Sequence, residues 1–203
     1  MNGIVVGWVA WLTGLPGSGK SSVAREAAAR LTASGLRVRV LELDEIRRVV
    51  TPSPRYTVEE REVVYRALAY MALLLYEEGV RVIIDATGHR RRFRDLARAM
   101  IPHFAEIHLR ASLARCRERA RDRRGSFAPQ DVYGQAGREE STVPGVDETY
   151  EPPLHPELVL DTEQLTVAEA VERLVRFLEV FPSGQAEMSL GVDRRGHRPG
   201  EER

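Results

Sequence analysis

A contiguous phosphate-binding motif constrains this chain most. Residues Gly14 to Ser21 have the spacing G-x-x-x-x-G-K-S of a P-loop. An apolar run over residues 8–12 predicts a buried strand before the motif, and an alanine-rich stretch over residues 22–31 predicts a helix after it. In this order the N–H groups of the turn and the positive end of the helix surround one polyphosphate. A turn kept only for glycine geometry does not need every fixed position. The predicted donor site is Gly14, Leu15, Pro16, Gly17, Ser18, Gly19, Lys20, Ser21 and Ser22.

Lys20 is the only lysine among the 30 lysine and arginine residues of the chain. A compact ammonium on a flexible stem follows the β- and γ-phosphates of a nucleotide, which a rigid guanidinium does less well. We therefore predict that Lys20 is a catalytic residue and that ATP is the phosphoryl donor. The hydroxyl of Ser21 is the predicted protein ligand of Mg²⁺.

Composition limits the other classes of function. With 203 residues and 43% hydrophobic content, the chain supports one core, and we expect one domain. Its 30 acidic and 30 basic residues cancel, so no net field attracts nucleic acid or an anionic membrane in bulk. Cys116 is the single cysteine, which excludes an internal disulfide and fits a reducing compartment. We expect a cytoplasmic protein with no nucleic-acid or membrane partner.

Apolar runs of strand length alternate with amphipathic segments along the chain. Further strands are predicted over residues 37–43, 80–85, 104–109 and 157–160. This alternation predicts an α/β fold with a five-stranded parallel sheet and helices on both faces. A long helix is predicted over residues 58–78, and its core-facing stripe comprises Val63, Val64, Ala67, Leu68, Met71, Leu74 and Leu75.

The last predicted helix ends near Phe181. The catalytic domain is therefore predicted to cover residues 1–181. Residues 182–203 are rich in glycine, arginine and glutamate and contain few apolar side chains, so we expect a disordered tail there.

Carboxylates follow two of the predicted strands, at the edge where parallel sheets bind ligands. Asp44 ends the strand over residues 37–43, and Glu42 lies two residues before it, so strand alternation predicts that both side chains face the same way. Asp85 ends the strand that usually lies beside the P-loop strand, which makes it a competing metal-site candidate. For Asp85 we weigh a helix N-cap and a catalytic role about evenly.

Six arginines precede the sequence Gly-Ser-Phe at residues 125–127. Small-molecule kinases close such segments over ATP, which excludes water and supplies positive charge to the transition state. Residues two apart do not share a helix face, so a solvated helix explains at least half of these arginines. We expect an arginine-rich lid that contains Arg115, Arg117, Arg119, Arg121, Arg123 and Arg124.

At this point the chain resembles a known family. The motifs WLTGLPGSGKSS, LELDEIRR and YTVEER, then the lid, then PGVDETYEPPLHPELVLDT follow the order and approximate spacing of adenylyl-sulfate kinases. The resemblance covers about Trp8 to Leu178, and the segment from Pro144 to Pro153 is its most specific part. It implies a P-loop kinase fold and an enzyme of sulfate assimilation that phosphorylates the 3′-hydroxyl of adenylyl sulfate with MgATP.

The resemblance also implies roles for individual residues. The acidic pair of the family falls on Glu42 and Asp44, and Asp44 is the implied proton acceptor. The arginines that bind the substrate fall on Arg47 and Arg61, and the ring that stacks on its adenine falls on Tyr56. These residue types suit the task, since guanidinium groups pair with a phosphosulfate and a tyrosine face suits a purine.

In the lid, the resemblance implies that Arg119 binds the nucleotide, with the pair Arg121-Asp122 as the alternative. Arg124 stands where the family has the lysine of Lys-Gly-Leu-Tyr and is an implied substrate contact. Relatives are commonly dimers, so a homodimer is an expected partner.

Departures from the family pattern concentrate in the acceptor site. Val64 stands in place of an asparagine, and Val143 stands in place of the second stacking aromatic. Gly88-His89 stands where the family has Ser-Pro. ATP use is therefore predicted more firmly than the identity of the acceptor.

Two further functions remain open for this chain. The first is a divergent P-loop kinase acting on another nucleotide-linked or small hydroxylated metabolite. The second is a nucleotide-binding regulatory module with little turnover. Retention of Asp44, Arg47 and Arg61 disfavours the module, because a protein that only binds nucleotide has no evident use for an acceptor site.

Overall fold

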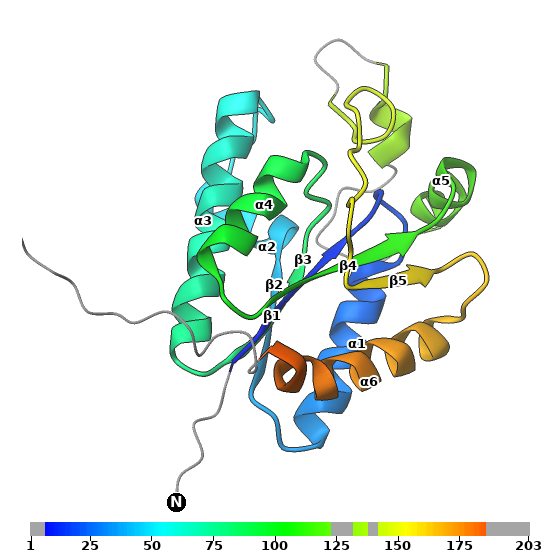
Figure 1. Ribbon diagram of the computed structural model, residues 1–203. Coiled ribbons are helices and arrows are strands. Elements are labelled where there is room, and N and C mark those ends of the chain that lie inside the picture. Colours follow the sequence, from blue (N-terminus) through cyan, green and yellow to red (C-terminus); the bar gives the residue numbers. More distant parts are fainter. Residues whose placement is uncertain (1–6, 123–131, 138–141, 186–203) are drawn as a thin grey trace, which may run out of the picture.

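The computed structural model describes residues 7–122, 132–137 and 142–185. Its centre is a five-stranded parallel sheet with the strand order β2-β3-β1-β4-β5 (Figure 1). The predicted α/β fold is confirmed. The strands are β1 (Val9–Thr13), β2 (Val38–Glu42), β3 (Arg81–Asp85), β4 (Phe104–Arg110) and β5 (Leu158–Asp161).

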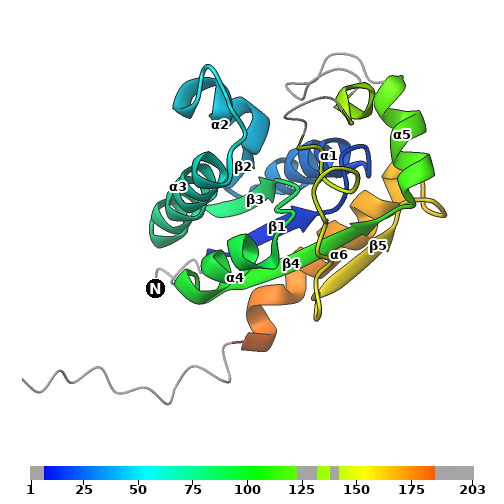
Figure 2. The ribbon, with the colours of Figure 1, turned by 90° about the horizontal axis from the view of Figure 1, so that it is seen from above.

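Helices cover both faces of this sheet, as the sequence predicts. In Figure 1, α3 and α4 lie on one side of the sheet and α1 and α6 on the other. Seen from above in Figure 2, α2 lies beside the end of α3 and α5 lies at the far side of the molecule. The helices are α1 (Lys20–Ala33), α2 (Leu43–Val50), α3 (Val58–Glu77), α4 (Arg91–Met100), α5 (Leu113–Arg121) and α6 (Val167–Gln185), with a short 3-10 helix at Val132–Gln135.

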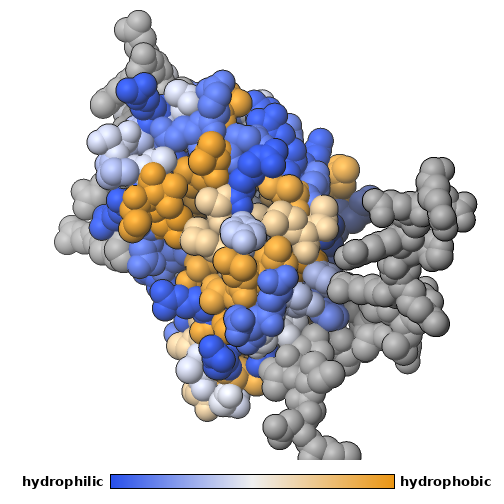
Figure 3. Space-filling view, turned by 90° about the vertical axis from the view of Figure 1, so that its left-hand side faces the viewer, coloured by the Kyte–Doolittle hydropathy of each residue, from blue (hydrophilic) through white to orange (hydrophobic). Residues whose placement is uncertain are grey.

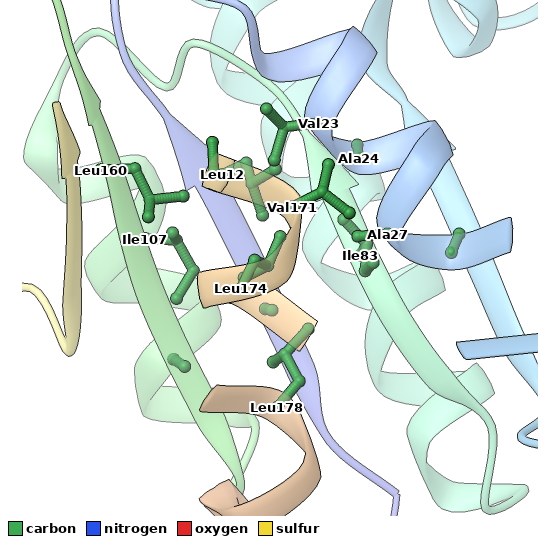
Figure 4. Close-up of a cluster of buried hydrophobic side chains, with 14 of the residues drawn as sticks. Leu12, Val23, Ala24, Ala27, Ile83, Ile107, Leu160, Val171, Leu174 and Leu178 are labelled. Carbon is green, nitrogen blue, oxygen red and sulfur yellow. The ribbon is translucent and has the colours of Figure 1, made fainter. Parts of the chain in front are cut away.

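Strand β1 lies at the centre of the fold, and all five of its side chains are buried. Ala10 and Leu12 face α1 and α6, where Figure 4 shows Leu12 among Val23, Ile107 and Leu174. Complete burial of one such leucine contributes about 1.5–3 kcal/mol. A strand that is apolar on both faces fits only between two helical layers, so its composition explains its position.

The other face of β1 packs against α3 and α4. Trp11 is fully buried there, and its indole N–H donates a hydrogen bond to the carbonyl oxygen of Ala86 at 2.9 Å. The ring stacks on that of Tyr65, with the centroids 6.1 Å apart. The indole therefore gains apolar contact without losing its polar partner.

The predicted apolar stripe of α3 is only partly right. Val64 and Leu68 are fully buried, but Val63 is 60% exposed and Leu74 is 44% exposed. This helix has apolar side chains around most of its circumference, so periodicity alone does not select the buried face. Figure 3 shows apolar surface on this side of the molecule. The buried residues of α3 are Arg61, Val64, Tyr65, Leu68, Ala69 and Ala72.

Two predicted boundaries are wrong. The strand predicted over residues 37–43 ends at Glu42, and Leu43 begins α2. The last helix continues past Phe181 to Gln185, so the predicted start of the tail at residue 182 lies inside α6. Residues 186–203 lie outside the described residues. Within the described ranges, no helix is both long enough and apolar enough to cross a membrane.

Candidate active site

The P-loop joins the end of β1 to the start of α1. Lys20 is the first residue of α1, and Gly19 before it has a left-handed conformation with φ of 98°. The Lys20 ammonium donates hydrogen bonds to the carbonyl oxygens of Gly14 and Leu15, at 2.9 and 3.0 Å. These bonds hold the positive charge at a helix N-terminus, where backbone N–H groups face an anion.

Two glycines of this loop have opposite surroundings: Gly17 is closely packed and Gly19 faces open space. A Cβ atom at Gly17 would lie 2.3 Å from the carbonyl oxygen of Cys116 in α5, so only glycine fits there. A Cβ atom at Gly19 would meet no described atom within 4 Å. The Ser18 hydroxyl is buried and has no hydrogen-bond partner among the described residues. Because a buried hydroxyl without a partner is costly, a phosphate oxygen suits this position.

Asp85 ends β3, which pairs with β1 as expected. Burial is the largest influence on its carboxyl group and raises its pKa. The Lys20 ammonium and a hydrogen bond with Ser21 act in the opposite direction, whereas Asp44 and Glu42 raise the pKa further. The P-loop and two more carboxylates therefore surround this one buried acid.

The helix N-cap that we weighed for Asp85 does not apply, because α4 begins at Arg91 and has Arg90 as its N-cap residue. In the described part of the chain, no three His, Cys, Asp or Glu side chains are grouped to hold a metal ion. Mg²⁺ sites that act on phosphates use one or two protein oxygens, and phosphate and water supply the remainder. The Ser21 hydroxyl and the Asp85 carboxylate fit that donor set.

The predicted acidic pair is divided between a strand and a helix. Glu42 is the last residue of β2, whereas Asp44 lies in the first turn of α2. The strand alternation from which we predicted one shared face is therefore wrong. Both carboxylate oxygens of Glu42 accept hydrogen bonds from Arg25 of α1, at 2.7 and 2.6 Å. The predicted substrate contact of Glu42 competes with this bidentate ion pair.

Asp44 acts on groups in both halves of the site. It raises the pKa of Asp85, where burial is the larger cause. It also raises the pKa of Tyr56, where burial is again the largest cause and Arg47 opposes it. The backbone agrees with both influences: Asp44 lies two residues after Glu42, which pairs in register with Asp85, and one helical turn before Arg47, which contacts the Tyr56 ring.

Tyr56 lies between the two arginines that the sequence analysis assigns to the acceptor. The guanidinium carbons of Arg47 and Arg61 lie 5.1 and 5.5 Å from the centre of its ring. Arg61 also donates hydrogen bonds to the carbonyl oxygen of Tyr56 at 3.1 Å and to Thr142, at 2.8 Å to its carbonyl oxygen and 2.7 Å to its hydroxyl. The fold thus brings together an aromatic face and two buried cations from separate segments.

A variant of the capping box, in which Glu60 accepts from N–H groups that precede the N-cap residue Thr57, fixes the turn that presents Tyr56. The Thr57 hydroxyl accepts a hydrogen bond from the N–H of Glu60, and the Glu60 carboxylate accepts from the N–H of Tyr56, both at 3.2 Å. The other oxygen of Glu60 accepts from Arg47 at 3.1 Å. Tyr56 has a positive φ of 56°, which is uncommon for tyrosine and is held by these bonds.

A cavity of about 500 Å³ opens beside this cluster. Its walls come from the start of α3, the start of α4 and the segment after residue 141. This volume lies in the range of small-molecule sites. The walls include Tyr56, Arg61, His89, Arg90, Phe93 and Thr142.

The segment from Pro144 to Pro153 connects the donor and acceptor halves. Arg90 pairs with Glu148 at 2.7 Å and with Glu151 at 3.5 Å, which ties the segment to the start of α4. At its other end, a Cβ atom at Gly145 would lie 2.4 Å from the side chain of Leu15 in the P-loop. The most specific motif of the sequence therefore packs against both halves.

Arg119 in α5 lies beside the P-loop. It donates hydrogen bonds to the hydroxyl and carbonyl oxygens of Thr162, at 3.2 and 2.6 Å. The Thr162 hydroxyl donates in turn to the carbonyl oxygen of Ser18 at 3.0 Å. The predicted lid arginines from Arg115 to Arg121 lie in α5, whereas Arg123, Arg124 and residues 125–127 lie outside the described residues. Nucleotide contact by Arg119 and closure of a lid stay predictions.

The two valines at departures from the family pattern are both buried. Val64 is fully buried in the core beneath α3, and Val143 is 6% exposed in a cluster with Cys116 and Tyr133. The chain therefore uses these two positions for apolar packing. Cys116 is buried in this cluster as a residue of α5.

Other residues of the site escaped the sequence analysis. The Tyr150 hydroxyl lies 3.1 Å from the Thr13 hydroxyl, and Thr13 donates to the carbonyl oxygen of Thr87 at 2.6 Å. Arg94 is 1% exposed, donates to the carbonyl oxygen of Gly88, and pairs with Glu106. Tyr150 stood inside a recognised motif, but nothing in the sequence marks which of many arginines becomes buried.

The fold and the site define a class: a P-loop kinase with a five-stranded parallel sheet. The family model described as "Adenylylsulphate kinase" matches residues 6–161. The chain belongs to the adenylyl-sulfate kinase family, whose members phosphorylate the 3′-hydroxyl of adenylyl sulfate in sulfate assimilation.

Individual relatives agree with this assignment. A probable adenylyl-sulfate kinase from Aeropyrum pernix is 36% identical over 173 residues, which cover 83% of this chain and 90% of the relative. The solved APS kinase of Mycobacterium tuberculosis in complex with AMPPNP and APS has a TM-score of 0.75 and 30% identity, and the match covers 85% and 98% of the two chains. A hexameric APS kinase from Thiobacillus denitrificans has a TM-score of 0.61 and 28% identity; the match covers 88% of this chain and 29% of that one.

Proposed function

We propose that this chain transfers the γ-phosphoryl group of ATP to the 3′-hydroxyl of adenylyl sulfate. The proposal rests on the place of Asp44 in the first turn of α2, just after the register pair of Glu42 with Asp85 and one turn before Arg47, which contacts the Tyr56 ring. A carboxylate between a phosphate site and an aromatic pocket is placed to orient an acceptor hydroxyl toward the donor.

In the donor half, the P-loop N–H groups and the Lys20 ammonium bind the β- and γ-phosphates and stabilise the charge that builds up during transfer. The Ser21 hydroxyl and the Asp85 carboxylate are the protein groups that would hold Mg²⁺. When bound, Mg²⁺ neutralises phosphate charge and helps to orient the transferred group. Ser18 contributes its buried hydroxyl to a phosphate oxygen.

In the acceptor half, Arg47 and Arg61 pair with the phosphosulfate, and Tyr56 offers a ring face to the adenine. Asp44 accepts the proton of the 3′-hydroxyl as the new O–P bond forms and the bond to the β,γ-bridging oxygen breaks. Asp44 is thus the proton acceptor and Asp85 the metal-site carboxylate, which divides the two roles between two acids. Arg25 keeps Glu42 against α1, beside but apart from this transfer.

The test measures ADP release by the purified full-length chain. Adenylyl sulfate, several other nucleotides and a set of sugars are each supplied with MgATP at equal concentrations. We expect adenylyl sulfate to stimulate release far above the ATPase background, and the product to carry its new phosphate on the 3′-oxygen. No stimulation by adenylyl sulfate would overturn the proposal.

A second acceptor is favoured by one observation. Val64 and Val143 are both packed into apolar clusters, in positions where the family resemblance expects an amide and an aromatic ring. A related hydroxylated metabolite that needs neither contact is the alternative substrate. Stimulation by a sugar or another nucleotide, and not by adenylyl sulfate, would favour this alternative.

Self-association is proposed through the outer face of α3. Val63, Tyr70 and Leu74 are 60%, 54% and 44% exposed and share this face. Arg66, which pairs with Glu62 of its own helix at 3.2 Å, and Glu77 lie on the same face, and two antiparallel copies of α3 would bring each Arg66 to the opposite Glu77 as well. Light scattering should detect a dimer that Arg66→Glu disrupts and that the double variant Arg66→Glu, Glu77→Arg restores.

Use of ATP also favours a cytoplasmic location.

A further inference from the structure

His89 occupies the floor of the acceptor cavity. It lies between β3 and α4, the residue is 2% exposed, and it is one of the residues that line the cavity. The ring centre lies 5.5 Å from that of Phe93 and 6.4 Å from that of Tyr65. Its carbonyl oxygen accepts a hydrogen bond from the N–H of Glu151 at 2.7 Å. Backbone and ring packing therefore both fix its place.

The imidazole nevertheless has an unsatisfied polar atom. Across residues 7–122, 132–137 and 142–185, only two buried side-chain polar atoms have no hydrogen-bond partner: Ser18 Oγ and His89 Nδ1. Ser18 lies in the P-loop, where a phosphate oxygen supplies its missing partner under the proposed function. A buried polar group left without a partner costs about 1–3 kcal/mol, so such groups concentrate where a ligand completes them. His89 Nδ1 is the corresponding atom in the acceptor half, because it is also buried and without a hydrogen-bond partner among the described residues.

The charge state of His89 narrows what it can bind. Burial is the main reason that the pKa of His89 is lowered to about 3. Arg61 of α3, Arg90 before α4 and Arg92 of α4 lower the pKa further, whereas Glu151 raises it. The imidazole is therefore neutral at physiological pH. A neutral ring has one nitrogen that donates and one that accepts a hydrogen bond.

The anionic part of the acceptor has better partners than this ring. Arg47 and Arg61 provide permanent charge for a phosphosulfate, whereas His89 adds none. The base of a nucleotide, in contrast, is uncharged and has a polar edge. Val143 stands in place of a second stacking ring, and Phe93 of the cavity wall is itself buried against Tyr65, so an edge contact to the base gains importance for recognition.

We propose that His89 is a specificity-determining residue of the acceptor cavity, and that its unprotonated ring nitrogen accepts a hydrogen bond from the 6-amino group of the acceptor's purine. This inference rests on the proposed function. With the proton of the neutral ring on Nε2, Nδ1 selects 6-aminopurines over 6-oxopurines, because a carbonyl oxygen at that position faces the lone pair of Nδ1.

The test compares adenylyl sulfate with inosinyl sulfate, in which a 6-oxo group replaces the amino group. Wild-type chain should show a KM for inosinyl sulfate at least about tenfold above that for adenylyl sulfate, the value of one good hydrogen bond. His89→Phe keeps a ring between Tyr65 and Phe93 but removes both nitrogens. In this variant the two KM values should become similar, while the KM for ATP stays within about twofold of wild type.

Two further variants separate recognition from structure. His89→Asn retains a short acceptor and should restore part of the preference for adenylyl sulfate, and it replaces His89→Phe if that variant does not fold. His155 is exposed outside the cavity, so His155→Phe should behave as wild type. An unchanged preference in both His89 variants overturns the proposal, as does an equal loss toward ATP, which indicates a structural role. If the wild-type chain does not turn over adenylyl sulfate, the proposed function is wrong. The proposed contact between His89 and the base is then wrong as well, because it depends on that function.

Discussion

The donor half of this site is built from one contiguous stretch of backbone, whereas the acceptor half is assembled from side chains of distant segments. Around the P-loop, the anion site is a turn and a helix N-terminus that adjoin in sequence. Around Tyr56, Arg61 reaches a partner at Thr142, 81 residues away. Backbone N–H groups bind any polyphosphate, and distributed side chains discriminate among acceptors. The donor is therefore readable from the P-loop motif alone, whereas the acceptor was predicted only from the order of several motifs along the chain.

The largest loss is expected from Lys20→Ala, which removes the one ammonium of the donor half. Loss of a preorganised group that stabilises transition-state charge costs about 10²–10³-fold in kcat, and we expect at least the upper value. Steady-state ADP release measures it. Acceptor binding, followed by calorimetry with adenylyl sulfate, should remain near wild type. A parallel loss of acceptor binding would show that the two halves are not separable at this residue.

The next effect is expected at the carboxylate between the halves. Asp44→Asn keeps the shape but removes the proton acceptor, so kcat should fall about 10²-fold or more. The KM for ATP and the binding of adenylyl sulfate should change little. Asp85→Asn is the matched control, because it should raise the Mg²⁺ concentration needed for half-maximal rate. Full activity in Asp44→Asn, with loss of proton transfer in Asp85→Asn, would reverse the two assigned roles.

The same contrast explains how much of the fold the sequence could predict. Each of the five strands begins and ends within one residue of its predicted bounds, because an apolar run between two polar turns marks both ends of a strand. The outward face of α3 was not predicted, since apolar residues around most of the helix leave its rotation to tertiary packing. The end of β2 was missed because Leu43 continues an apolar alternation although its backbone is helical.

Within the site, residues beside a motif were predictable and their partners were not. Arg47, Tyr56 and Arg61 were assigned through the family resemblance, and the fold places them together. Their supports depend on contacts across the chain, such as the hydrogen bonds of Arg61 with Thr142. One missed support did leave a local signal: Thr57 followed by Glu60 is a capping box in the sequence.

A smaller effect, on the KM for adenylyl sulfate, is expected at Arg61, whose side chain makes three hydrogen bonds within the acceptor half. Arg61→Met keeps much of the apolar stem but leaves two carbonyl oxygens and a hydroxyl without their donor. Loss of a charged hydrogen-bond donor should raise the KM for adenylyl sulfate about 10–100-fold. The KM for ATP should remain within about twofold, since the P-loop is separate. A similar rise in both values would contradict the division between the halves.

The smallest effect is expected in the pH dependence of the free energy of unfolding, through the buried carboxyl group of Asp85. The pKa of Asp85 is raised above its ordinary value, chiefly by burial, so the folded chain binds this proton more tightly than the unfolded chain does. Raising the pH above 3.8, the ordinary value, removes the proton at a cost that only the folded state bears. The contribution of Asp85 to the free energy of unfolding therefore falls as the pH rises through the folded pKa, and is then constant.

Asp85→Asn should remove this fall, because the amide stays uncharged and can still accept a hydrogen bond from Ser21. Denaturant titrations of both proteins between pH 4 and pH 8, without Mg²⁺ or nucleotide, measure the difference directly. The variant should gain stability relative to wild type as the pH rises. Parallel curves would contradict the raised pKa. Lower stability of the variant at every pH would instead make Asp85 a structural anchor, and the donor half would then depend on a side chain as the acceptor half does.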